Sequence, residues 1–153
     1  AAGLDAQFKE RTRNGLPAEI HVNDDCVMTG AFWVLKDGVK RWSHCEHRTV
    51  LFDTKHGTNA HDFKLGCFCI VDEHGKTHVI AACLVHVEDH EAFEWAFHRF
   101  REYFRKDPKV IFTDGDPAIR LAVNLVFKET THLLCVWHIS ENVYAPAESA
   151  ALR

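Results

Sequence analysis

Two aspartates stand at comparable places in apolar, strand-like runs of the chain. Asp53 lies within VLFDT, and Asp114 ends KVIFTD. A buried carboxylate is costly unless a hydrogen bond or a cation compensates it, so each aspartate needs a structural or a chemical reason. Polar groups at the strand ends of a mixed α/β sheet line the crevice in which ligands bind. We therefore expect the two acids to converge, although 61 positions (114 − 53) separate them.

A convergent pair of carboxylates predicts a divalent-metal site. Two close carboxylates raise each other's pKa by repulsion unless a cation lies between them. Oxygen ligands completed by water suit Mg²⁺ or Mn²⁺ better than Zn²⁺. Two such ions about 4 Å apart activate the attacking oxygen and stabilise the leaving oxygen when a phosphodiester is hydrolysed or transferred. The structural alternative is that Asp114 belongs to a strand-to-helix turn, TDGDPA, which Asp116 caps.

The hydrophobic pattern around these acids predicts an α/β domain. An acidic-glycine turn, DEHG at 72–75, makes the strands before and after it an antiparallel pair. Phe93, Ala96, Phe97, Phe100 and Phe104 have helical spacing. Asp116 and Pro117 have the residue types of a helix cap and a first helical position. The strands are expected at 18–22, 27–35, 49–52, 63–71, 77–87, 109–114 and 131–137, and a last helix at 138–145.

This element order favours a ribonuclease-H-like, mixed five-stranded sheet, in which three antiparallel strands precede alternating helices and strands. An N-terminal β-hairpin and a short helix or loop at 18–47 precede the core at 48–153. Residues 1–17 are polar, so they are expected to form a linker, a frayed helix or a segment foreign to the natural chain.

Composition narrows the class of protein. The chain has 153 residues and a net charge of −4, so it is one domain without a uniformly basic surface for nucleic acid. Its six cysteines include several in apolar runs, which is typical of reduced thiols in an intracellular protein. The opening residues lack a signal-peptide pattern, and no apolar stretch approaches the roughly 20 residues of a membrane-spanning helix. We expect a nuclear or cytoplasmic protein with no membrane partner.

Four blocks of the sequence resemble one known family in order and spacing. The blocks are VLFDTKHGTNAHDFKL, AACLVHVEDHEAFEWAFHRF, KVIFTDGDPAI and HLLCVWHISENVY. They are similar to the Mutator-like element (MULE) transposase domain, which plant far-red-impaired-response proteins also carry, and the resemblance covers roughly residues 27–144. It implies a ribonuclease-H-like core of the acid-acid-glutamate type, which cuts and joins DNA with Mg²⁺ or Mn²⁺.

The resemblance also assigns roles to single residues. It implies that Asp53 is the first catalytic acid and Asp114 the second. The family's third acid is a glutamate beyond an inserted helical region, and neither Glu141 nor Glu148 lies in a matching setting. We therefore expect a core truncated before its third acid. Lys55 replaces the family's threonine, which places a cation beside the site where it can contact phosphate but leaves full activity open.

Cys135 and His138 match the CxxH pair of the same family, for which the resemblance implies a role in local structure or in DNA contact. As a zinc site the pair supplies only two of the four expected ligands, so Zn²⁺ is disfavoured. A basic stretch is a second candidate for phosphate contact, although a solvated helix face explains it equally well. Its members are Arg99, Arg101, Arg105, Lys106 and Lys109.

Three hypotheses about function follow. The first is a DNA transposase core that cleaves and transfers strands between transposon ends and a target, in the nucleus, with homo-oligomerisation left open. The second is a domesticated, transposase-derived domain that binds DNA or protein in transcriptional regulation without catalysis. The third is a ribonuclease or exonuclease, because a fold does not fix a substrate.

Overall fold

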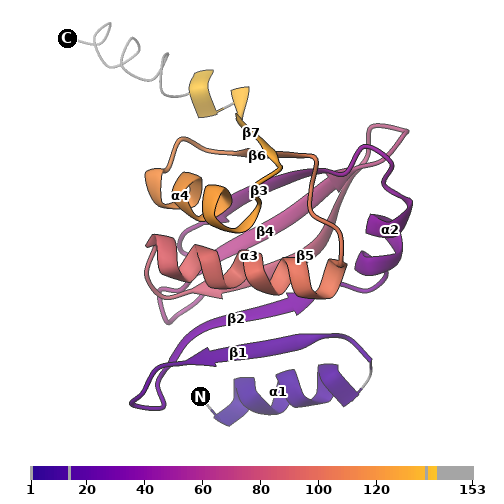
Figure 1. The fold of residues 1–153 in the computed structure, drawn as a ribbon. Coiled ribbons are helices and arrows are strands. Elements are labelled where there is room, and N and C mark those ends of the chain that lie inside the picture. The colour runs from indigo at the N-terminus through magenta and orange to yellow at the C-terminus, as the bar shows by residue number, and fades with distance from the viewer. Residues whose placement is uncertain (1, 14, 137, 141–153) are drawn as a thin grey trace, which may run out of the picture.

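A single seven-stranded sheet organises the protein (Figure 1). The structure, a computed structural model, describes residues 2–13, 15–136 and 138–140. In chain order the elements are α1 (Ala2–Arg13), β1 (Ala18–Val22), β2 (Met28–Val34), α2 (Gly38–His44), β3 (Thr49–Lys55), β4 (Lys64–Val71), β5 (Thr77–Val85), α3 (His90–Phe104), β6 (Val110–Thr113), α4 (Pro117–Val126) and β7 (Thr131–Leu134).

The sheet has the order β1-β2-β5-β4-β3-β6-β7. Strands β3, β4 and β5 pair antiparallel, whereas β6 and β7 join parallel to β3 and to each other. The expected antiparallel pair and the later alternation of helix and strand are therefore confirmed. The expected number of five strands is wrong, because residues 30–34 of β2 pair with residues 81–85 of β5 and the hairpin continues the same sheet.

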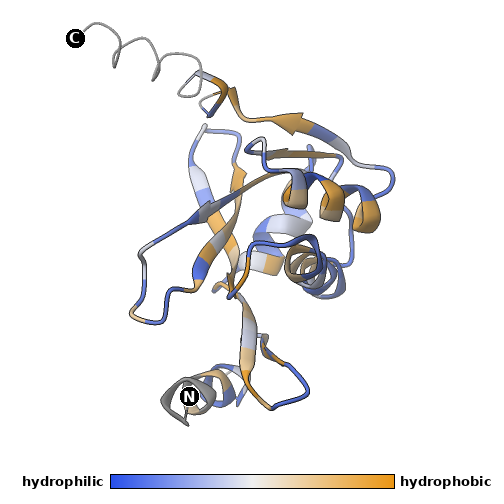
Figure 2. Ribbon diagram, turned by 90° about the vertical axis from the view of Figure 1, so that its left-hand side faces the viewer, coloured by the Kyte–Doolittle hydropathy of each residue, from blue (hydrophilic) through white to orange (hydrophobic). Residues whose placement is uncertain are grey.

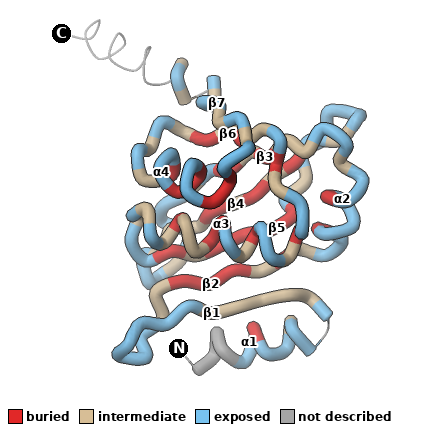
Figure 3. Tube along the Cα trace, in the orientation of Figure 1, coloured by how far each residue is buried: buried red, intermediate tan, exposed pale blue. Residues whose placement is uncertain are grey.

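Helices α3 and α4 cover one face of this sheet (Figure 2), and Trp42 of α2 enters the core on the same face. Asp89 caps α3 by accepting a hydrogen bond from the Ala92 N–H, and the apolar spacing of α3 then turns four phenylalanines toward the strands. Asp116 caps α4 in the same way, with Pro117 at its first turn, as predicted. The buried core lies between these helices and the central strands (Figure 3).

The N-terminal residues form a helix that packs on the edge of the sheet. In α1, Phe8 is buried against Trp33 of β2, with ring centroids 5.8 Å apart in an edge-to-face arrangement. The Arg11 guanidinium donates a hydrogen bond to the Val34 carbonyl at 3.1 Å. Residues 2–13 are therefore helical and attached to the sheet edge. Of the helix expected at 138–145, all but the first three residues lie outside the described part of the chain.

Within the described residues, no helix is both long and apolar enough to cross a membrane. The six cysteines, all of them in the described part, are free thiols.

Candidate active site

The parallel pairing of β3 with β6 brings Asp53 and Asp114 to one end of the sheet. Leu51 is the partner of Phe112 in the register, and each aspartate follows two residues later, Asp53 within β3 and Asp114 directly after β6. Adjacent strands lie about 4.8 Å apart, so the two acids emerge side by side toward the carboxyl ends of the strands. The register of β3 and β6 therefore brings these two residues together.

Asp53 is exposed, which corrects the expectation of a buried carboxylate. Its side chain is 57% accessible, while Val50 and Phe52 of the same strand are fully buried. Successive side chains of a strand point to opposite faces, so Phe52 enters the core and Asp53 emerges on the face that α3 and α4 leave open. The carboxylate does not pay a large desolvation cost and remains accessible to ligands.

Asp114 is half-buried and takes part in the turn that leads into α4. Its Oδ1 accepts a hydrogen bond from the Asp116 N–H at 3.1 Å. Asp116 itself accepts from the Ala118 and Ile119 N–H groups at 2.7 and 3.0 Å. The structural alternative for this segment, in which Asp114 belongs to the turn and Asp116 is the cap, therefore describes its local hydrogen bonds.

The CxxH turn places a histidine beside the first acid. The Cys135 N–H donates to the Thr113 carbonyl at 2.7 Å, and the Ile139 N–H donates to the Cys135 carbonyl at 3.1 Å. This turn is therefore tied to the end of β6, and it carries His138 Nε2 to 3.6 Å from Asp53 Oδ1. Cys135 contributes local structure through its backbone, while His138 belongs to the surroundings of the carboxylate.

The open face next to Asp53 also carries Lys55 and two thiols. Lys55 is exposed two residues beyond Asp53, and the alternation of the strand turns both to the same face. Burial and the Asp53 charge raise the pKa of Cys67, the partner of Asp53 in β4. Burial and the Cys67 and Asp53 charges raise the pKa of Cys69 to about 11. Both thiols therefore stay protonated near neutral pH.

Sequence reasoning missed two residues at this end. Glu88 accepts a hydrogen bond from the Thr54 hydroxyl at 3.1 Å, and its other oxygen lies 3.3 Å from His56 Nε2. His132 Nε2 lies 2.8 Å from the Thr113 hydroxyl, and burial followed by the Arg120 charge lowers its pKa. The alternation of THLL could have placed His132 beside β6. Nothing in the sequence indicated that the Glu88 loop meets β3.

The donor set fits a hard divalent cation only in part. Among the described residues, no three histidines, cysteines, aspartates or glutamates are grouped so as to hold a metal. Mg²⁺ nevertheless binds through one or two carboxylates, with waters and substrate phosphates completing its shell. The two aspartates meet that smaller requirement. Cys135 and His138 do not belong to a larger ligand group in the described residues, as a structural zinc site would need.

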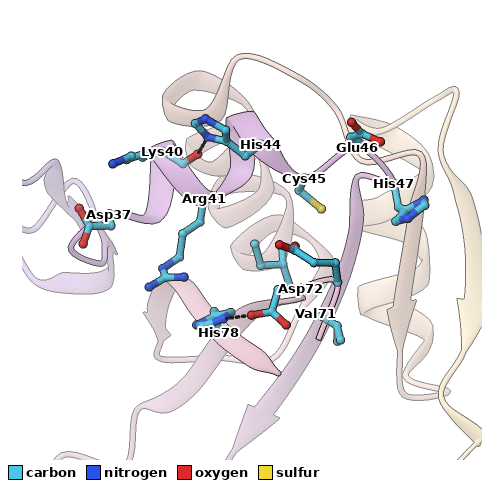
Figure 4. Close-up of a pocket in the computed structure, with 12 residues that line it drawn as sticks. Asp37, Lys40, Arg41, His44, Cys45, Glu46, His47, Val71, Asp72 and His78 are labelled. Atoms are coloured by element: carbon cyan, nitrogen blue, oxygen red, sulfur yellow. Dashed lines mark hydrogen bonds and ion pairs between the residues drawn. The ribbon is translucent and has the colours of Figure 1, made fainter. Parts of the chain in front are cut away.

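A cleft of about 750 Å³ lies elsewhere, between α2 and the β4–β5 turn (Figure 4). Its wall carries His78 and Asp72, whose side chains interact at 2.7 Å. That bond, with those from backbone N–H groups, lowers the pKa of Asp72 to about 2. Arg41 of α2 extends toward His78 and Asp72 on the opposite wall (Figure 4), and neither Asp53 nor Asp114 lines the cleft.

Comparison with known proteins places the same region in a family. Residues 49–142 match the MULE transposase domain. The chain is 29% identical to the FAR-RED IMPAIRED RESPONSE 1 protein of Arabidopsis thaliana over 126 residues, 81% of this chain and 15% of the relative. It is 29% identical to FAR1-RELATED SEQUENCE 10 of the same plant over 108 residues, 70% of this chain and 16% of the relative. The chain thus spans about one sixth of the length of these relatives or less.

Proposed function

The chain belongs to the MULE transposase domain family, and from that premise we propose that it supplies two acids of a DNA transposase core, which cleaves and transfers DNA strands. Its ribonuclease-H-like character and its location in the nucleus are parts of the same proposal. DNA, as transposon ends and target, is the proposed partner.

The register of β3 and β6 is the observation that carries this proposal. It brings Asp53 and Asp114 to adjacent strand ends, and both family acids thereby face one place. The family match covers both residues and the CxxH turn. If the two aspartates were only structural, there would be no reason for both to lie in the matched family region and also to meet on adjacent strands.

Asp53 and Asp114 would hold Mg²⁺ or Mn²⁺ in the proposed site. When bound, such ions supply charge neutralisation and an activated oxygen nucleophile for phosphodiester chemistry. His138, 3.6 Å from Asp53, restricts the orientation of that carboxylate. Lys55 extends an ammonium group on the same open face, where it attracts a phosphate of the DNA backbone.

Nicking of end-containing DNA by the full-length parent protein tests the proposal. We expect cleavage in Mg²⁺ or Mn²⁺ that is lost in Asp53→Asn and in Asp114→Asn but kept in Asp24→Asn, which removes a charge from the exposed β1–β2 turn. Equal cleavage by all four proteins would remove the metal-site assignment. RNA and RNA–DNA hybrid substrates run in parallel would identify a ribonuclease if they were cut in preference to DNA.

A second candidate is a domesticated domain that binds DNA or protein in transcriptional regulation without cutting. Lys55 favours it, because a permanent cation two residues from Asp53 on the same face can offset part of the negative charge that attracts a metal. Absence of cleavage by the wild-type protein, together with retained DNA binding, would support this second function over the first.

A further inference from the structure

The basic stretch at 99–109, which begins in α3, contains two kinds of cation: those paired with an acid and those that are not. Arg99 forms ion pairs with Glu19 at 2.9 Å and with Glu102 at 3.0 Å, and Arg101 pairs with Asp107 at 3.1 Å. The charges of these two arginines are therefore paired within the chain. The other three cations of the stretch are exposed and form no ion pair with any described residue: Arg105, Lys106 and Lys109.

The free cations lie on a well-anchored part of the backbone. The Lys106 carbonyl accepts a hydrogen bond from the Trp42 indole N–H at 3.2 Å, and the Lys109 carbonyl accepts one from the Thr131 N–H at 2.9 Å. The Lys109 N–H donates to the Arg48 carbonyl at 2.8 Å. The segment is thus fixed between α2, β3 and β7, at the amino ends of the parallel strands. We call Arg48, Arg105, Lys106, Lys109 and Lys128 the amino-end patch.

Two members of the amino-end patch occupy strained backbone positions. Arg48 has φ of 45° and Arg105 has φ of 62°. Glycine adopts this left-handed region without steric cost and is the usual residue after a helix such as α3. The Arg48 guanidinium has a contact within the chain, since it donates a hydrogen bond to the Asp107 carbonyl at 3.4 Å. Arg105 is exposed, so a use of its side chain outside the fold explains an arginine at this position.

The composition of the amino-end patch favours a polyanion over a protein partner. Five cations are accompanied by Glu46 in the turn before β3, by Glu129, and by Asp107, which Arg101 already neutralises, although the whole chain carries a net charge of −4. Protein interfaces need buried apolar or aromatic anchors. In the described chain, none of the large apolar side chains that are exposed lies between residues 105 and 110.

We propose that the amino-end patch binds the sugar-phosphate backbone of duplex DNA. Asp53 follows Arg48 by five residues and Asp114 follows Lys109 by five, so the patch lies roughly 16 Å from the two acids at about 3.3 Å per residue. The patch therefore does not overlap the two acids. The interaction goes beyond the proposed cleavage, because it needs neither a metal nor the two acids.

Fluorescence anisotropy with a labelled 20-bp duplex in EDTA tests the patch on the full chain. In Lys106→Gln/Lys109→Gln we expect Kd to rise about tenfold at low salt, and the slope of log K against log salt to fall by about 2, one for each lost phosphate contact. The control Lys9→Gln/Arg13→Gln removes the same charge from α1 and is expected to bind like wild type. Unchanged binding in the patch variant, or an equal loss in the control, would overturn the proposal.

Two further variants separate this proposal from its alternatives. Arg105→Gly relieves a left-handed arginine, so we expect Tm to stay the same or rise while DNA affinity falls about threefold. Retained affinity in that variant would contradict a role for Arg105. Asp53→Asn/Asp114→Asn removes two negative charges, so its DNA affinity in EDTA is expected not to fall, and a fall would show that binding depends on the proposed cleavage site and not on the patch. Binding of polyglutamate is measured in the same way. If the patch variant loses more affinity for polyglutamate than for DNA, the partner is an acidic protein and the DNA proposal is rejected.

Discussion

Phe52 and Asp53 are neighbours in the chain but belong to opposite faces of the sheet. The face beneath α3 and α4 packs Phe52 against Phe68 and Phe97, with centroid separations of 4.7 and 5.0 Å. On the other face, Asp53 is largely accessible and lies beside half-buried thiols. The covered face therefore stabilises the fold. The open face carries accessible polar groups, which the packed core of the covered face holds in place.

The covered face should respond most strongly to loss of an aromatic ring. Phe68 is fully buried and contacts four other phenylalanines. We expect Phe68→Ala to lower the free energy of unfolding by about 3–5 kcal/mol, since it removes apolar contacts and leaves a cavity. Urea unfolding measures this change. Val71→Ala, on the exposed side of the same strand, is the matched control, and a loss as large as that of Phe68→Ala would break the comparison between the faces.

A substitution on the open face should lower catalytic activity without lowering the stability of the fold. In Asp53→Asn we expect the metal-dependent nicking rate to fall by roughly 10²–10³-fold, or about 3–4 kcal/mol in activation free energy. The free energy of unfolding is expected to change by less than about 0.5 kcal/mol, because the side chain is exposed. Kinetic assays and urea unfolding on the same preparation measure both quantities. A parallel loss of stability and activity would show that Asp53 is structural.

Gly66 provides a finer test of packing on the covered face. A Cβ at this position would lie 2.6 Å from Cys83 Sγ and 2.9 Å from the Phe52 ring. We expect Gly66→Ala to destabilise the fold by about 1–3 kcal/mol through overpacking. The control is Gly115→Ala, where a Cβ meets nothing within 4 Å. Thermal unfolding compares the two, and Cys83→Ala is expected to recover part of the loss in the Gly66 variant.

The same functional group can be compared on the two faces through its pKa. Burial raises the pKa of Cys83, on the covered face, to about 12 and that of Cys69, on the open face, to about 11, from an ordinary value of 9.0. A thiol pKa that is higher in the folded state stabilises the protein below about pH 9, and this contribution is lost as pH rises toward the folded pKa.

We therefore expect stability to fall above about pH 9, and Cys69→Ala to make that fall shallower. Urea unfolding at a series of pH values measures the slope. Cys26→Ala, at an exposed cysteine, is expected to leave it unchanged. In alkylation assays on the native protein, modification of Cys83 before Cys69 would contradict the assignment of the faces.

The sequence predicted elements better than their surroundings. The helical spacing from Phe93 to Phe104 and the cap at Asp116 yielded α3 and α4, because both signals are local. The pairing of β2 with β5 escaped prediction, since backbone hydrogen bonds between distant strands leave no residue pattern. Strand β3 continues past the apolar run at 49–52 to Lys55, because its pairing with β4 extends through these polar residues.

The residues of the candidate site were named from the sequence, but their environment was anticipated only in part. The strand pattern and the family resemblance both singled out Asp53 and Asp114, the resemblance alone singled out His138, and the strand register brings the two acids to one end of the sheet. Exposure of Asp53 was not anticipated, because an apolar run does not reveal that one face of the sheet lacks a helix. Glu88 reaches β3 through a loop, and loop paths depend on tertiary packing that local sequence does not encode.

The parallel pairing of β3 with β6 also has a consequence for the order of folding. Thr49 and Val110 are partners across 61 positions (110 − 49), whereas β4 and β5 are joined by a short turn. Closing the longer loop costs more chain entropy before its contacts form, so we expect the hairpins to form early and β6 to dock late. The two acids would then come together only near the end of folding. Partly folded chains would therefore contain both residues but not yet the site that they form.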